Sequence, residues 1–349
     1  MSQTELKTRP EPSEAGVSEV ALSGVGAASV IKHDRARALA AFKLDERVFY
    51  WVTRLSALCV LAILGGILLT LIVGAWPALR AYGFEFLWTQ RWAPQLKPDP
   101  ILGALGPLYG TLVTSFIAMV IAVPIGIGIA IFLTELCPQF ARRPVSLAIE
   151  LLAGVPSIIY GMWGFFVLGP FLADTFQPTM IAIFQHVPVL NSIFAGPPSN
   201  LSLFNASLVL AIMILPFITA ISRDVFNTVP PMLKESAYGL GCTTWEVMRN
   251  VVIPYTRVGV IGGVMLALGR ALGETMAVTF IIGNSFRISS SLFAPGTTIS
   301  AAIASEFAES DGLHQSALIL LGLLLFVLTL AVLTIARLLL ARIERREGV

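Results

Sequence analysis

The chain has 349 residues, of which 56% are hydrophobic and only 13% are charged, and its mean hydropathy is +0.82. This composition excludes an ordinary soluble domain and predicts a membrane protein with several spans. The formal net charge of +2 identifies no partner, because in a membrane protein the placement of basic residues matters more than their sum.

The first 47 residues are polar and become basic toward their end. No short apolar segment with a small-residue cleavage site precedes the first long apolar run, so we expect no secretory signal peptide. We expect residues 1–47 to form a cytoplasmic tail that is largely disordered, with residues 30–47 as a candidate amphipathic surface helix.

Six long apolar runs follow, and each meets the roughly 17 to 25 residues that a helix needs to cross a bilayer. They cover approximately residues 52–76, 108–133, 146–172, 205–221, 258–282 and 316–340. Pro124, Pro156 and Pro170 lie inside these runs, where proline kinks or breaks a helix. We therefore predict an all-α polytopic membrane protein, with a six-helix transmembrane domain over residues 48–342 and a short cytoplasmic tail over residues 343–349.

The segment between the third and fourth runs, residues 174–204, contains no Lys or Arg. Its apolar stretch Met180–Phe184 is too short to span and is followed by Gln185, His186 and Pro188. We expect an external loop with, at most, an interfacial helix.

Basic residues are distributed unequally between the two sides of an alternating six-span arrangement. One side holds the basic end of the tail, Arg142 and Arg143, the loop at about residues 223–257 and the arginines of the C-terminus. The other side holds only Arg80, Arg91, Lys97 and Arg287. The positive-inside rule predicts that both termini and the 223–257 loop are cytoplasmic.

The 223–257 loop contains a spaced motif: Glu235-Ser236-Ala237, then Gly241, and after nine further residues Val251-Val252-Ile253-Pro254. Its charged residues exclude it from hydrocarbon, where each charge costs about 2.5 to 3.5 kcal/mol. Gly241 lies where a helix of one or two turns would end, and glycine adopts the left-handed conformation of a helix end without steric cost. The pattern predicts a helix, a sharp turn and a second helix, in a shape suited to a soluble partner.

The fifth apolar run carries two charges, Arg270 and Glu274, near its centre. Ionisable groups at that depth are functional candidates. In a continuous helix residues i and i+4 share a face, and Arg before Glu is the weaker orientation for pairing, which favours a second partner such as an anionic substrate. A purely structural ion pair is the alternative. Glycines on the same run allow another backbone to approach closely; they are Gly262, Gly263, Gly269 and Gly273.

The loop motif resembles the EAA motif of ATP-binding-cassette importer permeases, with Ser236, Val251 and Ile253 replacing the usual Ala, Ile and Leu. Residues 269–280 are very similar to the corresponding helix of phosphate-specific transport permeases of the PstC type. Residues 110–115 and 156–164 resemble the same family, and the resemblance covers roughly residues 45–342.

The resemblance implies a type I ABC importer permease fold with a cytoplasmic coupling loop, in a bacterial inner (plasma) membrane. It places Arg270, Glu274, Thr275 and Thr279 along the substrate pathway, where Arg270 offsets the charge of phosphate. It also implies that an ATPase subunit contacts Glu235, Ser236, Ala237, Gly241 and Pro254.

The implied partners are a second permease subunit (PstA-like), a dimeric ATP-binding subunit (PstB-like), an external phosphate-binding protein (PstS-like) and membrane lipid, with no nucleic acid. The chain has no Gly-x-x-x-x-Gly-Lys-Ser/Thr segment, so we expect ATP and Mg²⁺ to bind the partner ATPase and this chain to be no enzyme and to hold no cofactor or metal.

Three other functions remain open. The first is a permease for a related oxyanion (sulfate, molybdate or phosphonate), and the second is the PstA-type companion subunit. The third and more distant one is an ATP-independent transporter or channel.

Overall fold

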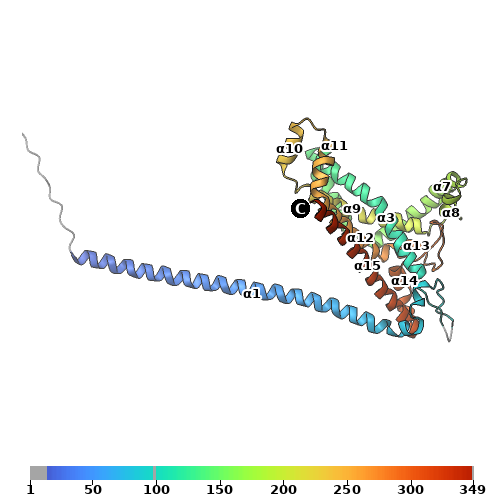
Figure 1. The fold of residues 1–349 in the computed structure, drawn as a ribbon, viewed down its shortest axis with the longest axis horizontal. Helices are drawn as coiled ribbons and strands as arrows, with labels where there is room; N and C mark the ends of the chain where they lie inside the picture. The colour runs from blue at the N-terminus through green and yellow to red at the C-terminus, as the bar shows by residue number, and fades with distance from the viewer. Residues whose placement is uncertain (1–13, 97–99, 348–349) are drawn as a thin grey trace, which may run out of the picture. The chain divides into compact units, whose positions relative to one another are not determined.

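The computed structural model describes residues 14–96 and 100–347, where β-structure is confined to one isolated bridge between Ala93 and Ile101. The chain divides into two compact units at Leu68, within the first helix, and Figure 1 traces the helices in chain order. They are α1 (Glu14–Tyr82), α2 (Glu85–Trp88), α3 (Leu105–Ile131), α4 (Gln139–Ala153), α5 (Ser157–Trp163), α6 (Gly169–Phe171), α7 (Gln177–Phe184), α8 (Pro188–Phe194), α9 (Leu203–Phe226), α10 (Pro231–Gly239), α11 (Thr244–Val247), α12 (Ile253–Leu272), α13 (Met276–Ile282), α14 (Ile299–Glu306) and α15 (Gly312–Glu347).

Short π-helical turns join several of these helices, at Phe132–Leu136, Gly164–Leu168, Leu172–Phe176 and Met248–Val252. Within the described ranges, six helical stretches are long and apolar enough to cross a membrane, which confirms the predicted all-α polytopic class. They are Glu46–Tyr82, Leu105–Leu136, Ser157–Phe184, Leu203–Phe226, Thr244–Leu272 and Gly312–Arg342.

The N-terminal segment differs from the expected tail. Helix α1 begins at Glu14 and continues without a break into the first span, whereas we expected residues 1–47 to be largely disordered, with residues 30–47 as a candidate surface helix. A helix that extends an existing helix needs no new nucleation, and alanines such as Ala27 and Ala28 propagate it well. Residues 1–13 of the expected tail lie outside the described residues.

The third span begins and ends later than the predicted 146–172. Residues 139–153 form the separate helix α4, and the chain breaks at Gly154–Pro156 before the span Ser157–Phe184 starts. Pro156 has no N–H to donate and keeps the residue before it out of the α conformation, which explains the break. The stretch Met180–Phe184, expected in an external loop, is instead the end of this span.

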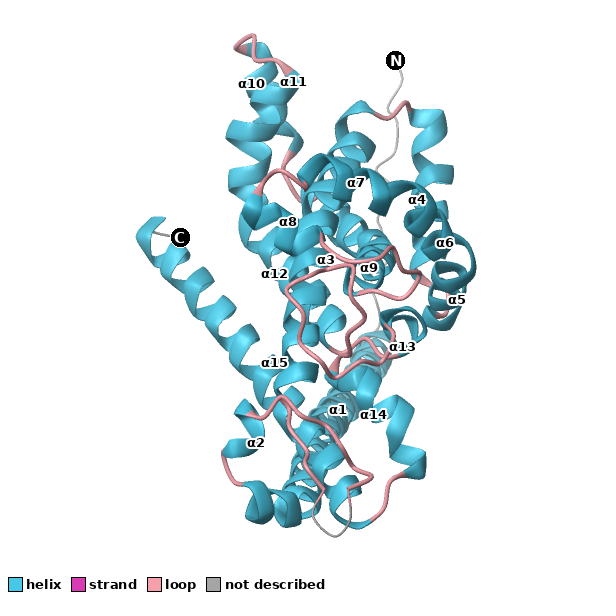
Figure 2. Ribbon diagram, turned by 90° about the vertical axis from the view of Figure 1, so that its right-hand side faces the viewer, coloured by secondary structure: helices cyan, strands magenta, loops and turns pink. Residues whose placement is uncertain are grey.

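The core of the second unit is the contact between α3 and α9, which run side by side (Figures 1 and 2). Small residues of α3 allow this approach: Ala118 and Ala122 are fully buried, and a Cβ at Gly126 would lie 2.9 Å from Ile218 Cγ2. The Thr219 hydroxyl also donates to the carbonyl of Gly126, at 3.3 Å. Helix α3 is therefore fixed against α9 by close packing, as small-residue interfaces are in membranes.

Two glycines of α3 are expected to differ sharply on substitution. A Cβ at Gly110 would lie 1.9 Å from the carbonyl oxygen of Thr297, whereas a Cβ at Gly128 meets nothing within 4 Å. Gly110→Ala should lower the free energy of unfolding by roughly 1–3 kcal/mol through overpacking. Gly128→Ala should leave it unchanged or raise it slightly, because alanine favours helix. Thermal unfolding of the two purified variants measures this, and equal changes in both would contradict the packing.

Candidate functional site

The fifth predicted span, residues 258–282, is interrupted at the position where its two central charges lie, because the span that the structure forms there, Thr244–Leu272, ends before Gly273. Helix α12 ends at Leu272 and α13 begins at Met276, so the predicted continuous helix over residues 258–282 is wrong. Gly273 ends α12 (φ −93°, ψ 1°), and Thr275 (φ −112°, ψ −64°) precedes α13. Gly273 and Thr275 both disfavour a continuing helix, because glycine loses much backbone entropy in a helix and threonine loses side-chain freedom. The break lies between these two residues.

Arg270 and Glu274 therefore do not share a helical face, and that prediction is also wrong. Arg270 is exposed in the last turn of α12, and within the described residues its side chain has no hydrogen bond or ion pair. Glu274 is half-buried in the break, and its Oε1 accepts from the backbone N–H of Ala277 at 3.4 Å. A carboxylate at a helix N-terminus is favourable, so Glu274 caps α13 instead of pairing with Arg270.

The two threonines of the predicted pathway lie beside this break. The Thr275 hydroxyl donates to the carbonyl of Gly273 at 3.2 Å, and the Thr279 hydroxyl donates to the carbonyl of Thr275 at 2.7 Å. Each hydroxyl has only one proton to donate, so in this arrangement both oxygens offer lone pairs to a ligand. Among the described side chains at the break, Arg270 has donors that no hydrogen bond or ion pair occupies, so they are available for an anion.

Helix α13 is held rigidly from behind by α5. A Cβ at Gly161 would lie 2.9 Å from Ala277 Cα, and Ala277, Val278 and Ile281 are buried. The opposite face of α13 exposes Met276 and Phe280. The break thus combines a fixed backbone with an accessible edge.

Only one of the four predicted glycines makes a close contact with another helix. A Cβ at Gly263 would lie 2.5 Å from Ile221 Cγ2 of α9. Gly262 has no neighbouring atom within 4 Å, and Gly269 has only Leu333 Cδ1 at 3.7 Å. Gly262 therefore leaves room beside α12 for a further chain, whereas Gly269 faces α15 at ordinary contact distance.

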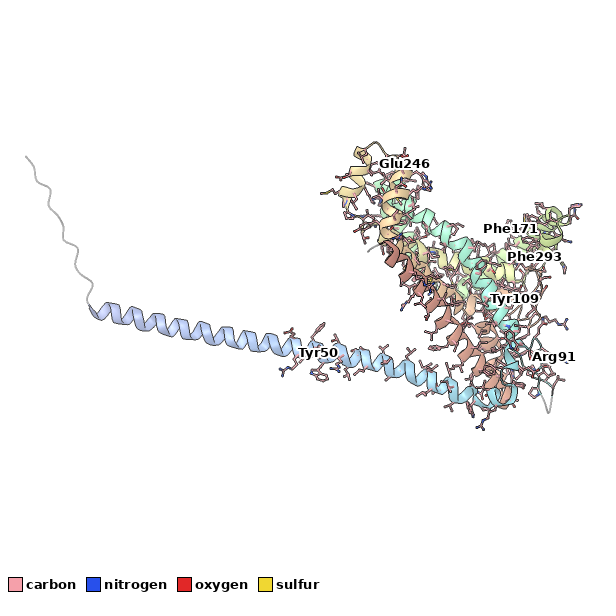
Figure 3. The ribbon with its side chains drawn as sticks, in the orientation of Figure 1. Tyr50, Arg91, Tyr109, Phe171, Glu246 and Phe293 are labelled. Carbon is pink, nitrogen blue, oxygen red and sulfur yellow. The ribbon has the colours of Figure 1, made fainter. Side chains whose placement is uncertain are left out.

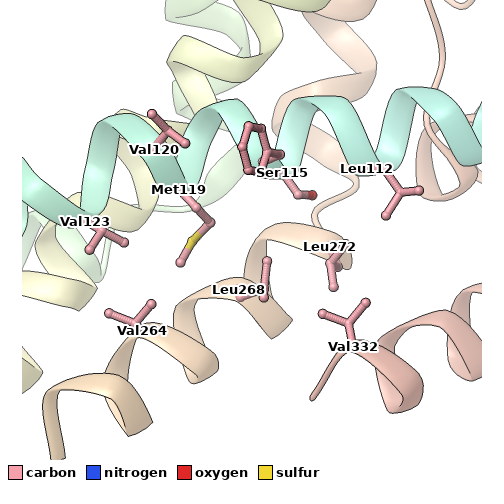
Figure 4. Close-up of a pocket in the computed structure, with 10 residues that line it drawn as sticks. Leu112, Ser115, Met119, Val120, Val123, Val264, Leu268, Leu272 and Val332 are labelled. Carbon is pink, nitrogen blue, oxygen red and sulfur yellow. The ribbon is translucent and has the colours of Figure 1, made fainter. Parts of the chain in front are cut away.

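A cavity of about 410 Å³ lies between α3, α12 and α15 (Figure 4). Ser115 is the only polar residue among those that line it, and its buried hydroxyl has no hydrogen-bond partner. An anion there would lose its water without gaining donors, at a cost of several kcal/mol. This cavity is therefore not an anion site, and the exposed break is the better candidate.

The second predicted site, residues 231–247, is a helix, a turn and a second helix, as the spacing predicted. We call residues 231–247 the α10–α11 element. Figure 3 labels Glu246, which lies in its second helix, α11. Gly241 adopts φ +86°, the left-handed conformation that favours glycine. Glu246 accepts from the N–H of Thr243 at 2.8 Å and donates its own N–H to the Thr243 hydroxyl at 3.4 Å, which fixes the start of α11 as a capping box.

The predicted contact residues divide between the two sides of this element. Ala237 is buried against the ends of α3 and α9 in a cluster with Ala130, Phe226, Val247 and Met248. Glu235, Ser236, Gly241 and Pro254 are exposed. Large apolar side chains are exposed beside them: Met232, Leu233, Tyr238, Leu240 and Trp245. An exposed apolar surface that combines with charge is typical of a protein interface.

One pair of charges at this site was missed from the sequence. Lys234 Nζ lies 2.5 Å from Oε1 of Glu135, which belongs to the π-helical turn Phe132–Leu136 directly after α3. Lys234 is one of the charges that exclude the loop from hydrocarbon, and no local pattern in the sequence connects it with Glu135. The one available signal was a lone acidic residue directly after the second apolar run.

Comparison with known proteins gives one family. Residues 122–345 match the family described as "Binding-protein-dependent transport system inner membrane component". The chain is 60% identical over 294 residues to a phosphate transport system permease protein PstC of Mesorhizobium japonicum, covering 84% of this chain and 89% of that protein. It is 55% identical over 303 residues to the protein of the same name from Pasteurella multocida, covering 87% and 94%.

A solved structure shares the fold. It is the crystal structure of a bacterial alginate ABC transporter in complex with an alginate pentasaccharide-bound periplasmic protein, with a TM-score of 0.55 and 17% identity. The match covers 85% of this chain and 94% of that one.

Proposed function

The chain belongs to the family of binding-protein-dependent transport system inner membrane components, and from this premise we propose that it is the PstC-type permease subunit of an ATP-driven phosphate importer. The observation that carries the proposal is the 60% identity, over 84% of the chain, to a protein named as a phosphate transport permease. The names of the relatives favour phosphate over sulfate, molybdate or phosphonate, and the PstC type over its PstA companion.

The chemistry of the break between α12 and α13 fits this substrate. Phosphate carries one or two charges near neutral pH and must lose water on entering a narrow path. The guanidinium of Arg270 offsets that cost with two parallel hydrogen bonds, and within the described residues nothing else occupies its donors. Thr275 or Thr279 accepts a hydrogen bond from a protonated phosphate oxygen beside it.

Glu274 has a separate role in this proposal. Its carboxylate is held on the N-terminus of α13 by the hydrogen bond from Ala277. It therefore does not form an ion pair with Arg270, and it stays beside the proposed pathway. A fixed negative charge near the anion weakens its binding, and a transported ion must leave as well as enter. Glu274 therefore keeps phosphate from binding Arg270 too tightly to be released.

The α10–α11 element is the proposed docking site of the ATPase. Glu235 and Ser236 are exposed next to a projecting apolar surface that includes Leu240 and Trp245, which are 86% and 63% exposed. A dimeric, PstB-like subunit binds ATP and Mg²⁺, so this chain needs neither and catalyses no reaction. A PstA-like permease completes the pathway, and a PstS-like protein delivers phosphate from outside.

Docking of the ATPase on the α10–α11 element determines the orientation that we propose for the chain in the membrane. The ATPase needs cytoplasmic ATP, so the α10–α11 element faces the cytoplasm of a bacterial inner membrane. With six spans, both termini then lie on the same side as that element, in agreement with the positive-inside rule.

Copurification tests the proposal against an ATP-independent transporter or channel. The tagged chain, expressed with its neighbouring subunits, should bring down an ATP-binding subunit and a second permease. The isolated chain should hydrolyse no ATP, and the complex should. Phosphate transport by the chain alone, with no ATPase bound, would overturn the assignment.

A further inference from the structure

The ion pair between Lys234 and Glu135 is largely shielded from water. The distance from Nζ to Oε1 is 2.5 Å, and the two side chains are only 19% and 10% exposed. Neither residue has a second ion-pair partner within the described residues. A charge buried to this extent depends on its partner, and removing one member costs far more than it does in an exposed pair.

The pair joins two elements that are 99 residues apart in sequence. Lys234 lies in α10, directly before Glu235 of the proposed ATPase contact. Glu135 lies in the π-helical turn Phe132–Leu136, which continues α3. A displacement of α10 is therefore transmitted through the ion pair to the end of α3, the helix that packs along α9.

Apolar contacts alone would fix this junction less firmly. The cluster between the α10–α11 element and the ends of α3 and α9 includes the small residues Ala130 and Ala237. Apolar burial is non-directional, so such surfaces can slide over each other. A charge-assisted hydrogen bond has a defined distance and direction, and it resists separation as well as approach.

The same π-helical turn is also bonded to α4. The guanidinium of Arg142 donates to the carbonyl of Thr134, with 2.7 Å between nitrogen and oxygen. Helix α4 leads through Gly154–Pro156 into α5, and α5 packs on α13 beside the proposed phosphate site. A displacement of the turn therefore reaches both α3 and the helix behind the pathway.

We propose that Lys234 and Glu135 are positioning residues that transmit movement of the ATPase-bound α10 to α3 and α4. The proposal rests on the proposed function, because it requires an ATPase docked on α10. The pair then serves energy coupling: when it is broken, ATP is still hydrolysed but much less phosphate is carried per ATP.

Charge reversal tests this in the complete complex reconstituted in vesicles. The variants are Lys234→Glu, Glu135→Lys and the double exchange, and the quantity measured is phosphate transported per ATP hydrolysed. Each single reversal should lower this ratio about tenfold while the ATPase subunit still copurifies. The double exchange should restore it to within about twofold, because the pair is re-formed with its charges swapped. Lys234→Arg keeps the charge and should stay near the parent.

Asp224→Asn is the matched control. Asp224 also pairs with an arginine near the same end of the bundle, Arg223 at 2.8 Å, but its side chain is 66% exposed. An exposed pair contributes little, so this variant should keep the parental ratio.

Several results would overturn the proposal. Single reversals that keep the parental ratio remove the pair from coupling, and a double exchange as poor as the singles shows that the interaction between the two residues is not what matters. Loss of ATPase copurification in the singles assigns the pair to assembly. If the parent complex carries sulfate and not phosphate, the proposed function fails, and the same ratio measured with sulfate still tests the pair.

Discussion

Arg270→Gln should abolish phosphate uptake and leave the complex assembled. The neutral amide cannot replace two charge-assisted hydrogen bonds to a desolvated oxyanion, each worth about 1.5–3 kcal/mol, so uptake should fall at least about 100-fold. Arg270 is exposed and has no partner within the described residues, so its loss should not disturb packing. Uptake of labelled phosphate and the yield of complex, measured together, check both expectations.

Two further variants sharpen this test. Arg270→Lys keeps the charge but loses the planar fork, so it should retain partial uptake. Arg287→Gln removes an exposed arginine beyond the end of α13 and should transport normally. If Arg287→Gln lost as much uptake as Arg270→Gln, the loss would reflect the removal of any positive charge near α13 and not a specific role of Arg270.

The double variant Arg270→Gln with Glu274→Gln decides between a pathway and a structural pair. A structural pair predicts that removing both charges restores uptake. Glu274 bonds the N–H of Ala277 instead, so we expect the double variant to stay inactive. Restored uptake would remove Arg270 from the phosphate path.

Gly241→Val should abolish both ATPase copurification and uptake, with the spans still inserted. Gly241 has φ +86°, and the left-handed conformation costs an L-residue about 1–2 kcal/mol, more when it is β-branched. The turn would then relax and move the exposed surface around Leu240 and Trp245. The measurement is the amount of ATP-binding subunit recovered with the tagged chain.

Gly239→Ala is the control for this prediction. Gly239 lies two residues earlier at the end of α10, without a positive φ, and a Cβ there meets nothing within 4 Å. This variant should bind the ATPase and transport normally. Equal behaviour of the two variants would contradict a role for the left-handed turn.

Local signals predicted the α10–α11 element well. The left-handed conformation of Gly241 followed from glycine at the end of a short helix, and the charges of the loop excluded it from hydrocarbon. The break between α12 and α13 did not follow from the sequence, because residues 258–282 form an apolar run long enough to span. Gly273 was visible, but we interpreted it as a packing residue and not as a helix end.

Features that depend on distant segments were beyond prediction. The contact of Lys234 with Glu135 joins residues 99 positions apart, and neither shows a local pattern that identifies the other. Pro156 indicated a break in the third span, but the apolar residues on both sides favoured one run across it. The sequence singled out Arg270 as a charge inside an apolar run, but its separation from Glu274 could be seen only in the backbone.

ATP-dependent uptake of labelled phosphate by the reconstituted assembly tests the central claim most directly. Vesicles that hold the two permeases and the ATPase should accumulate phosphate only with ATP on the side of the α10–α11 element and the phosphate-binding protein on the other side. Excess unlabelled phosphate should compete, whereas sulfate and molybdate should not. Uptake that needs no ATP, or that sulfate or molybdate blocks as well as phosphate does, would contradict a phosphate-specific importer.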